Sequence, residues 1–418
     1  MLIVASFVVI ANPVSATGFT QVTLAYPLDN IYSVTADIVA ASGQIITGTI
    51  NATGADIGVY VGPGITGVTI TATIFGATMA GIYADEGSSS VVVTGSTIYE
   101  IGNHAQSGSY SPNGVQYGWG VIFASGVTGS INHNVISQYQ KGGIVLLGSD
   151  DVSVEHNTVT GSGPISYIAQ NGIEVDDGAT ATVSHNTVTA NMYIPTTYAA
   201  TGILLYDAGS SVVSHNSVSS NGYGIYVFND GSVTATYGVS HNNVQSDTYA
   251  GILIYGAAAT VDHNKVSMNE YSNSYWGGNY GPLGTYYETY GSTSNPSSYY
   301  YSSGIYLWDA GGTTVDHNIL EYNDVGIWVY DDQILESSYS ISHNVIGNTN
   351  YYGIVFDGAS GTSDHNVILN SPVGLMATTE ISLSNTVTST HDVFIGVQTT
   401  TSVLQDPSNP GYTAEIIS

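Results

Sequence analysis

Short alternating runs of apolar and polar residues, rich in Val, Ile and Thr, recur along most of the chain. Such alternation predicts β-strands that bury one face, and no stretch has a convincing helical period of useful length. One kind of run begins with Gly-Ile, as in GIEVDDG at 172–178 and GIYLWDAG at 304–311. A second kind surrounds the pair His-Asn, as in VSHNTV and ISHNVI. The pattern therefore predicts an all-β fold built from many short strands.

Both kinds of run repeat with a short period. The starting glycines stand at 58, 81, 120, 143, 172, 202, 224, 251, 304, 326, 353 and 374, and the His-Asn pairs have His at 133, 156, 185, 215, 241, 263, 317, 343 and 365. The shortest intervals between glycines are 21 to 23 residues, which suits one coil of a parallel β-solenoid with a continuous apolar column inside. We expect about 12 coils over residues 58–388, preceded by a β cap at 17–57 and followed by a cap at 389–418.

The His-Asn pairs fall between two strand-like runs. There we expect the Asn to adopt the left-handed backbone conformation of a tight corner. Stacked copies can hydrogen-bond their side-chain amides from coil to coil, and we expect the stacked histidines to be neutral and partly buried. The alternative is a metal-binding column of histidines. The structural ladder is favoured because successive copies lack a converging set of carboxylates or cysteines.

The motif Gly-Ile-x-Val/Leu followed by Val-x-His/Asn-Asn-x-Val resembles the repeat of the pectin-lyase-like superfamily, over about residues 58–388. The resemblance implies a single-stranded right-handed parallel β-helix, the fold of pectate lyases, polygalacturonases and many surface proteins. In that superfamily the substrate cleft lies over the strand that corresponds to the Gly-Ile run. The resemblance says little about activity, because one fold hosts many functions.

Alternation along the Gly-Ile strand places the first and third residues after Gly inside and the second and fourth outside. In most coils these outer positions hold aromatic or apolar residues. Exposed aromatic patches of this extent usually mark an interaction site, and flat rings can stack on sugars. Lateral assembly of rods and a second core covered by loops are the alternatives. The candidate substrate-binding residues are Glu174, Tyr206, Tyr226, Phe228, Tyr255, Tyr306, Trp308, Trp328 and Tyr330.

Insertions predict a groove along this strand face. Longer insertions near 101–119, 156–172, 185–202 and 263–304 precede the Gly-Ile strand, and smaller ones near 231–238 and 332–339 follow it. They should therefore emerge on its two edges, since a solenoid places insertions on its functional face. The longest one, at 268–303, adds nine Tyr and Trp276.

An acidic row follows the platform at Asp177, Asp207, Asp309 and Asp331. Each Asp can simply cap the turn after its strand. Alternatively, carboxylates on neighbouring coils can act on a sugar as general acid and as base or nucleophile. The candidate catalytic residues are then Asp176, Asp177 and Asp207, beside Glu174. No cofactor is required, although calcium is a third option, with Asp309, Asp331 and Asp332 as its candidate ligands.

Charge restricts the partners of the chain. It carries 31 acidic side chains against 2 basic ones, Lys141 and Lys265, for a net charge of −29. That excludes nucleic acid as a partner and argues against docking on anionic membranes. Lyases of the resembled superfamily typically need a basic residue, and only Lys141 lies near the expected groove. A polygalacturonase resemblance is confined to the pair Asp176-Asp177. If the protein is an enzyme, a hydrolase acting on neutral glycans is favoured over a lyase.

The first residues resemble a secretory signal. An apolar run at 2–10 is followed by small residues at 14–16, which predicts a signal peptide over 1–16, with a buried first strand as the alternative. These nine apolar residues are too few to span a membrane, and no apolar run elsewhere is long enough for a transmembrane helix. We expect a secreted or cell-surface protein that binds extracellular polysaccharide. A polysaccharide-cleaving enzyme and a structural or adhesive rod that self-associates are the alternatives.

Overall fold

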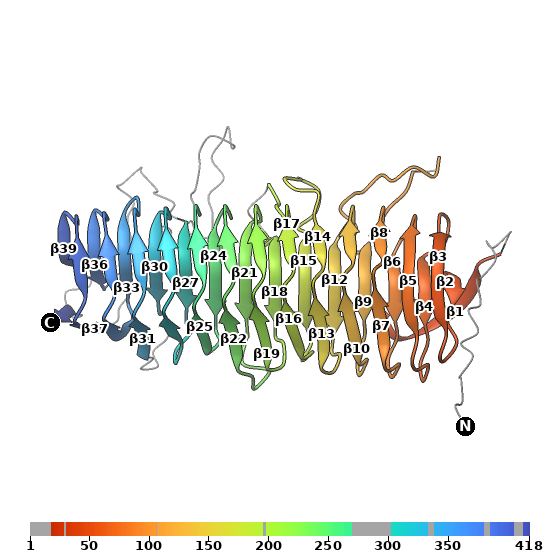
Figure 1. Ribbon diagram of the computed structural model, residues 1–418, viewed down its shortest axis with the longest axis horizontal. Coiled ribbons are helices and arrows are strands. Elements are labelled where there is room, and N and C mark those ends of the chain that lie inside the picture. The colour runs from red at the N-terminus through yellow and green to blue at the C-terminus, as the bar shows by residue number, and fades with distance from the viewer. Residues whose placement is uncertain are drawn as a thin grey trace, which may run out of the picture.

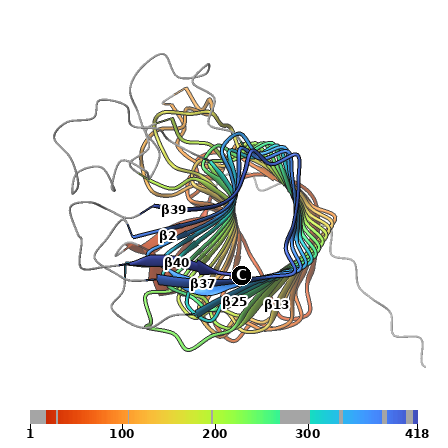
Figure 2. The ribbon, with the colours of Figure 1, turned by 90° about the vertical axis from the view of Figure 1, so that its left-hand side faces the viewer.

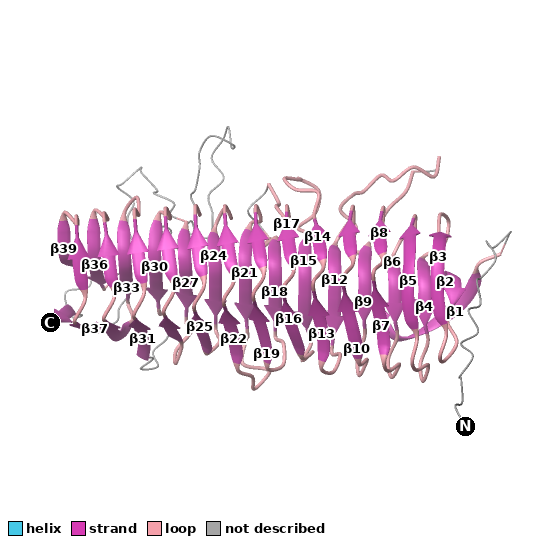
Figure 3. Ribbon diagram, viewed as in Figure 1, coloured by secondary structure: helices cyan, strands magenta, loops and turns pink. Residues whose placement is uncertain are grey.

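The computed structural model describes residues 18–28, 31–105, 107–194, 198–269, 302–332, 338–379, 385–404 and 413–418. These residues form strands and turns that wind into a long rod of stacked coils (Figures 1 and 3). The described strands belong to two sheets, sheet A with 15 strands and sheet B with 25. The expected all-β parallel solenoid of about 12 coils is confirmed. The predicted signal peptide at 1–16 lies outside the described residues.

Sheet A is built from the Gly-Ile strands. Its strands are, in order, β1 (Thr20–Leu28), β2 (Ile31–Val39), β4 (Ile57–Val61), β6 (Ala80–Ala84), β9 (Trp119–Phe123), β12 (Gly142–Leu147), β15 (Asn171–Asp176), β18 (Thr201–Tyr206), β21 (Tyr223–Phe228), β24 (Ala250–Tyr255), β27 (Ser303–Trp308), β30 (Val325–Tyr330), β33 (Tyr352–Asp357), β36 (Val373–Thr378) and β39 (Thr399–Leu404).

Sheet B has two arms that meet where the His-Asn pairs stand. The first arm contains β3 (Ile45–Asn51), β5 (Thr69–Phe75), β7 (Val91–Thr94), β10 (Gly129–Asn132), β13 (Val152–Glu155), β16 (Ala181–Ser184), β19 (Ser211–Ser214), β22 (Tyr237–Ser240), β25 (Ala259–Asp262), β28 (Thr314–Asp316), β31 (Ser338–Ser342), β34 (Ser360–Asp364), β37 (Asn385–Thr390) and β40 (Ala414–Ile417). The second arm contains β8 (Thr97–Tyr99), β11 (Val135–Ser137), β14 (Thr158–Thr160), β17 (Thr187–Thr189), β20 (Ser217–Ser219), β23 (Asn243–Gln245), β26 (Lys265–Ser267), β29 (Ile319–Glu321), β32 (Val345–Gly347), β35 (Val367–Leu369) and β38 (Val393–Ile395).

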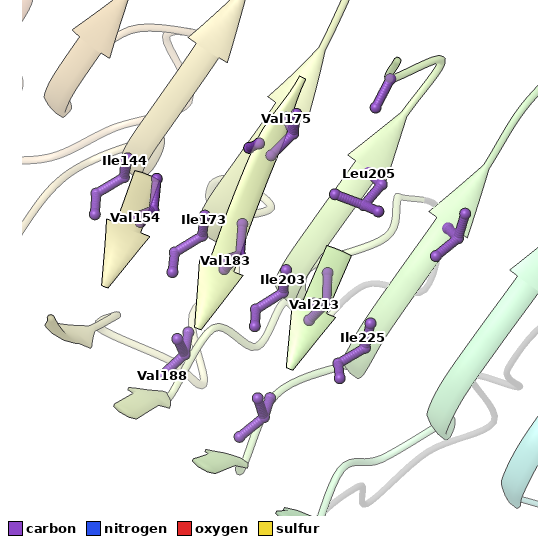
Figure 4. Close-up of a cluster of buried hydrophobic side chains, with 14 of the residues drawn as sticks. Ile144, Val154, Ile173, Val175, Val183, Val188, Ile203, Leu205, Val213 and Ile225 are labelled. Atoms are coloured by element: carbon purple, nitrogen blue, oxygen red, sulfur yellow. The ribbon is translucent and has the colours of Figure 1, made fainter. Parts of the chain in front are cut away.

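Equivalent residues of successive coils are in register, so one apolar column fills the rod. Ile173 of β15 pairs with Ile203 of β18, which pairs with Ile225 of β21. All three side chains are fully buried, and Figure 4 shows them pointing into the interior from neighbouring strands. The inward positions of the Gly-Ile strand are therefore the first and third after Gly, as alternation predicts. This fixes which side chains face outward.

The starting glycine of each coil is required by close packing. A Cβ at Gly202 would lie 2.6 Å from Cγ1 of Val218 and 2.7 Å from the carbonyl oxygen of Gly224. Both distances are shorter than real Cβ contacts, and the backbone oxygen cannot move aside cheaply. The recurring Gly therefore lets each sheet A strand turn close against its own core and the next coil.

Side-chain amides form a buried ladder along the corner between the arms of sheet B. Each Asn that follows a ladder His donates from Nδ2 to Oδ1 of the next copy at 2.9–3.0 Å, as between Asn186 and Asn216. The left-handed residue of this corner is the His, with φ between 54° and 58°, so the assignment of that conformation to Asn was wrong. The amide must turn inward to reach the next coil, which leaves the tight turn to the preceding residue.

The histidines also differ from expectation in burial. They are exposed rather than partly buried, and they stack on one another with ring centroids 4.4–5.1 Å apart. A tenth member, His391, extends the column, although Asp392 follows it instead of Asn. The ladder is thus an amide column inside and an imidazole column outside.

Strand β1 lies over the outer face of sheet A in the first coils. It pairs antiparallel with β2, and Leu24 packs in a second apolar cluster with Tyr60 and Tyr83. The buried carboxylate of Asp85 accepts hydrogen bonds from the backbone N–H groups of Ala25 and Tyr26 at 2.7 and 2.9 Å. The outer face is therefore covered up to the coil of β12, and its polar part begins at β15. Among the described residues, no helix is both long and apolar enough to cross a membrane.

Candidate functional site

Four carboxylates meet where the cover provided by β1 ends. Glu174 and Asp176 stand on β15 and face outward, Asp177 follows that strand, and Asp207 follows β18 on the next coil. We call these four residues the acidic cluster. Tyr206 of β18 is in register with Asp176, so the cluster lies directly beside the first aromatic residue of the platform. The sequence-predicted cluster is thus brought together by coil stacking.

Asp176 has a raised pKa. Burial, together with the negative charge of Glu174, raises the pKa of Asp176 to about 7, although the backbone N–H of Asp177 donates to its Oδ1 at 2.6 Å. Burial disfavours the ionised carboxylate, and a nearby like charge adds to that effect. A carboxyl group with such a pKa can act as a general acid in neutral solution.

Glu174 is held in place by a chain of hydrogen bonds. Nδ2 of Asn171 donates to Oε2 of Glu174 at 2.9 Å, and Oγ1 of Thr201 donates to Oδ1 of Asn171 at 2.9 Å. Both supporting residues are buried, with 4% and 0% exposure. Glu174 is therefore the acceptor end of a preorganised network, which is the arrangement that a positioned base or sugar-binding group needs.

Asp207, and Asp309 at the equivalent position of a later coil, hold turns. Oδ1 of Asp207 accepts the backbone N–H of Asp230 on the next coil at 2.8 Å, and Oδ1 of Asp309 accepts that of Asp332 at 2.9 Å. Asp177, Asp207 and Asp309 all have a positive φ, between 45° and 55°. This is the turn-capping role that the sequence left open beside the catalytic one.

Tyr26 closes the site from the side of β1. Its hydroxyl donates to Oδ2 of Asp177 at 2.7 Å, and burial followed by this hydrogen bond raises the pKa of Tyr26 well above its ordinary value. Tyr26 was not among the predicted site residues. It lies 151 positions away from Asp177 in sequence, and no local pattern in β1 predicts the contact. Asp177 is thus engaged in fastening β1 to the rod.

Aromatic rings line up along the outer face of sheet A beyond the acidic cluster. The row begins with Tyr206 and Phe228, whose ring centroids lie 4.7 Å apart at an interplanar angle of 28°. Tyr255 and Trp308 stack at 4.5 Å and 10°. Phe228 meets Tyr255 edge to face. Each stacked partner covers one face of the other. Tyr255 and Trp308 also pack against a buried apolar cluster of Tyr223, Ala250 and Leu253.

The remaining platform residues differ in exposure. Tyr226, Tyr306 and Trp328 are half-buried, and Tyr306 contacts both Trp308 and Trp328 with ring centroids 6.1 and 5.8 Å apart. Tyr330 is only 1% exposed, so its ring is packed rather than offered to a ligand, and its assignment to substrate binding is corrected. Tyr206 is 43% exposed, and its row neighbour toward the N-terminus is Asp176, not a ring. Tyr206 therefore joins the aromatic row to the acidic cluster.

Insertion loops gather on the flank of the rod that carries sheet A, as the end-on view in Figure 2 shows. Lys141, the basic residue expected near the groove, donates from Nζ to the carbonyl oxygen of Ala169 at 3.1 Å and so tethers one of these loops. The tyrosines of the longest insertion and Trp276 lie outside the described residues.

The expected calcium ligands do not form a converging set. Asp331 is 3% exposed and its Oδ2 accepts the hydroxyl of Tyr339 at 3.1 Å, whereas Asp332 is exposed. Among the described residues, the groups of three whose ligand atoms lie close enough to hold an ion do not include Asp309, Asp331 and Asp332. Calcium binding there stays a prediction.

Comparisons with known proteins agree with this architecture. The family described as "Right handed beta helix region" matches residues 9–236, 119–292 and 201–390. A comparison with curated proteins found no sequence match. The surface protein and adhesin PfbA of Streptococcus pneumoniae is similar in structure, with a TM-score of 0.49 and 13% identity, over 84% of this chain and 92% of PfbA.

Two further solved structures are similar. The tailspike protein of E. coli bacteriophage HK620, in complex with a hexasaccharide, has a TM-score of 0.52 and 13% identity over 91% of this chain and 69% of the tailspike. The periplasmic alginate epimerase AlgG has a TM-score of 0.47 and 13% identity over 86% of this chain and 78% of the epimerase. At such identities the likeness extends to the fold alone.

Proposed function

Since the chain belongs to the right-handed β-helix family, we propose that it is a carbohydrate-binding rod whose site lies on the outer face of sheet A. The observation that carries the proposal is the junction of Tyr206 with Glu174 and Asp176. It combines an exposed ring, a held carboxylate and a carboxyl group with a raised pKa on two neighbouring strands. An apolar surface with a few fixed polar groups is what binding sites for small molecules usually present.

The ligand is a neutral polysaccharide. A net charge of −29 repels polyanions but does not repel an uncharged polysaccharide. Sugars offer apolar C–H faces to aromatic side chains and hydroxyl groups to carboxylates, which matches the aromatic row and the acidic cluster. The HK620 tailspike, which shares the fold and was solved with a hexasaccharide, supports this choice of ligand class.

Affinity electrophoresis in gels containing dextran, galactomannan or alginate tests the proposal. We expect retardation by a neutral polysaccharide and none by alginate. Tyr206→Ala should weaken binding at least tenfold, since it removes the exposed ring at the junction. Tyr32→Ala is the matched control, because Tyr32 is 55% exposed on β2, far from the acidic cluster. No retardation by any neutral polysaccharide, or equal weakening by both variants, would contradict the proposal.

A second candidate function is glycan hydrolysis by Glu174 and Asp176. Glu174 and Asp176 stand two residues apart on β15, so both side chains leave the same face of the strand. Inverting glycosidases hold their carboxyl groups about 6.5–9.5 Å apart, with one protonated and the other ionised. Asp176 with its raised pKa fits the acid, and the hydrogen-bonded Glu174 fits the base. In this proposal Glu174, and not Asp177 or Asp207, is the partner of Asp176. The side chain of Asp177 binds Tyr26 of β1, and that of Asp207 holds a turn.

Hydrolysis is tested by reducing-end release from the polysaccharide that binds. Asp176→Asn should lower release at least a hundredfold while binding persists, and the fresh product should have the inverted anomeric configuration by proton NMR. Asp150→Asn, an exposed carboxylate on the preceding coil, is the control. Release that survives Asp176→Asn would exclude this pair. Binding without release would leave the protein a non-catalytic rod.

We further propose that the rod acts outside the cell. The apolar start of the chain and the preference for a polysaccharide ligand support this location. Side-by-side association through the aromatic row is the competing use of the same surface. Sedimentation at several concentrations separates the two, because association predicts a sedimentation coefficient that rises with concentration and falls back with Tyr206→Ala.

A further inference from the structure

The outer column of histidines contains two places where carboxylates converge. Nδ1 of His317 lies 2.5 Å from Oδ2 of Asp316, and Nδ1 of His343 on the next coil lies 3.2 Å from Oδ1 of the same carboxylate. The sequence expectation that no carboxylate converges on the column is therefore wrong here. One Asp presents an oxygen to each of two stacked imidazoles.

The same arrangement recurs two coils further on. Nδ1 of His365 lies 2.9 Å from Oδ2 of Asp364, and Nδ1 of His391 lies 3.2 Å from Oδ1. In each triad one ligand atom from every residue lies within 4.8 Å of the other two. The recurrence follows from a sequence pattern, Asp-His-Asn on one coil and Ser-His or Thr-His at the equivalent place on the next.

Hydroxyl groups orient both carboxylates. Oγ of Ser342 donates to Oδ1 of Asp316 at 2.8 Å, and Oγ1 of Thr390 donates to Oδ1 of Asp364 at 2.6 Å. These hydrogen bonds fix the direction in which each carboxylate points its oxygens at the two imidazoles. Groups that orient a ligand in this way are typical partners of metal-binding side chains.

We propose that each triad, Asp316–His317–His343 and Asp364–His365–His391, binds one divalent transition-metal ion of the zinc or copper class. Two imidazole nitrogens and one carboxylate oxygen are ligands that such ions prefer, and calcium or magnesium would require oxygen alone. Three protein ligands leave a fourth position to water, as in open zinc sites.

The geometry needs only a small adjustment. The ligand nitrogens of the two histidines lie within 4.8 Å of each other, and zinc–nitrogen bonds of about 2.0–2.1 Å at a tetrahedral angle bring them to about 3.3 Å. The rings of His317 and His343 stack with centroids 4.9 Å apart and are 49% and 47% exposed, so they can tilt toward each other without disturbing the core. The net charge of −29 concentrates cations at the surface of the rod.

Titration calorimetry with zinc chloride on chelator-treated full-length protein at pH 7.5 tests the proposal. We expect two sites per chain in the wild type, one in Asp316→Asn or Asp364→Asn, and none in the double variant. Asp262→Asn is the matched control and should keep two sites. Among the described residues, its carboxylate is paired with one ladder imidazole only, that of His263.

Copper(II) supplies a second readout, because its electron paramagnetic resonance spectrum reports the number of coordinating nitrogens. In Asp364→Asn, which keeps one triad, we expect two nitrogens per ion, and one after the additional change His343→Ala. The altered residues are exposed or at the surface, and circular dichroism verifies that each variant folds. Absence of zinc binding in the wild type at 100 μM, about a hundredfold above a micromolar site, would overturn the proposal. Two sites in the double variant would equally overturn it.

Discussion

Replacing Asp176 with Asn should make the stability of the rod less sensitive to pH. The folded chain raises the pKa of Asp176 from an ordinary value of 3.8 to about 7, chiefly by burial. Between these two values the folded chain holds a proton that the unfolded chain has released. The free energy of unfolding therefore falls as pH rises through this window, and the loss is complete above about pH 7.

The size of the effect follows from the rise in pKa. A rise from 3.8 to about 7 corresponds to a ceiling of about 4 kcal/mol. Because the side chain is only half-buried, water screens the charge, and we expect about 1–3 kcal/mol. Asn keeps the shape of the side chain and has no charge to bury. The variant should thus match the wild type near pH 4 and exceed it by about 1–3 kcal/mol at pH 8.

Denaturant unfolding followed by circular dichroism at several pH values between 4 and 8 measures this difference. The many other carboxylates change the stability of both proteins alike, so only the difference between variant and wild type is interpreted. Asp150→Asn, an exposed carboxylate, should show a difference close to zero at every pH. A difference for Asp176→Asn that stays constant from pH 4 to 8 would refute the reasoning, since it would mean that Asp176 ionises as easily in the fold as outside it.

Three further predictions concern the framework that holds the site, and each is measured by thermal or denaturant unfolding. Asn216→Ala removes a 2% exposed member of the amide ladder and leaves its two neighbours without a hydrogen-bond partner, so it should lower the free energy of unfolding by about 3 kcal/mol. A loss below about 0.5 kcal/mol would show that the ladder contributes little to stability. Gly202→Ala should lower the free energy of unfolding by more than about 2 kcal/mol, because its Cβ would lie 2.6 Å from a methyl group of Val218. Gly238→Ala should be nearly neutral, because the atom nearest to its Cβ would be 3.8 Å away. Similar losses in the two variants would contradict the packing argument. Asp247 stands in a second buried column, in which Asn191 donates to Asn221, Asn221 to Asp247, and Asn269 to Asn323. Burial raises the pKa of Asp247 well above its ordinary value, so Asp247→Asn should raise stability at pH 8 and not at pH 4; destabilisation at both pH values would contradict it.

The winding of the chain and the outward face of sheet A were predictable because the repeat removes the ambiguity of single strands. One strand such as GILLYDAG can face either way, but the same phase in successive coils fixes Ile203 inside and Tyr206 outside. Stacking in register then places Asp176 beside Tyr206 without further information. Periodicity gives the direction of a side chain and not its exposure, which is why Tyr330, at the same position of its strand as Tyr206, is nevertheless buried.

Contacts outside the repeat could not be predicted. Tyr26 reaches Asp177 across 151 positions, and this pairing depends on how β1 folds back over the first coils. The orientation of stacked rings and the choice of His rather than Asn for the left-handed corner depend on side-chain packing, which alternation does not encode. His391 was missed because Asp392 replaces the Asn of its pair, although Asp392 still accepts the amide of Asn366 at 3.0 Å.

The place of the ligand is tested most directly by a crystal structure of the rod soaked with an oligosaccharide of the neutral polysaccharide that it binds. The account predicts sugar density against the ring of Tyr206, with a hydroxyl group within hydrogen-bonding distance of Glu174 or Asp176. Sugar density on sheet B or along the histidine column, with the outer face of sheet A empty, would contradict it.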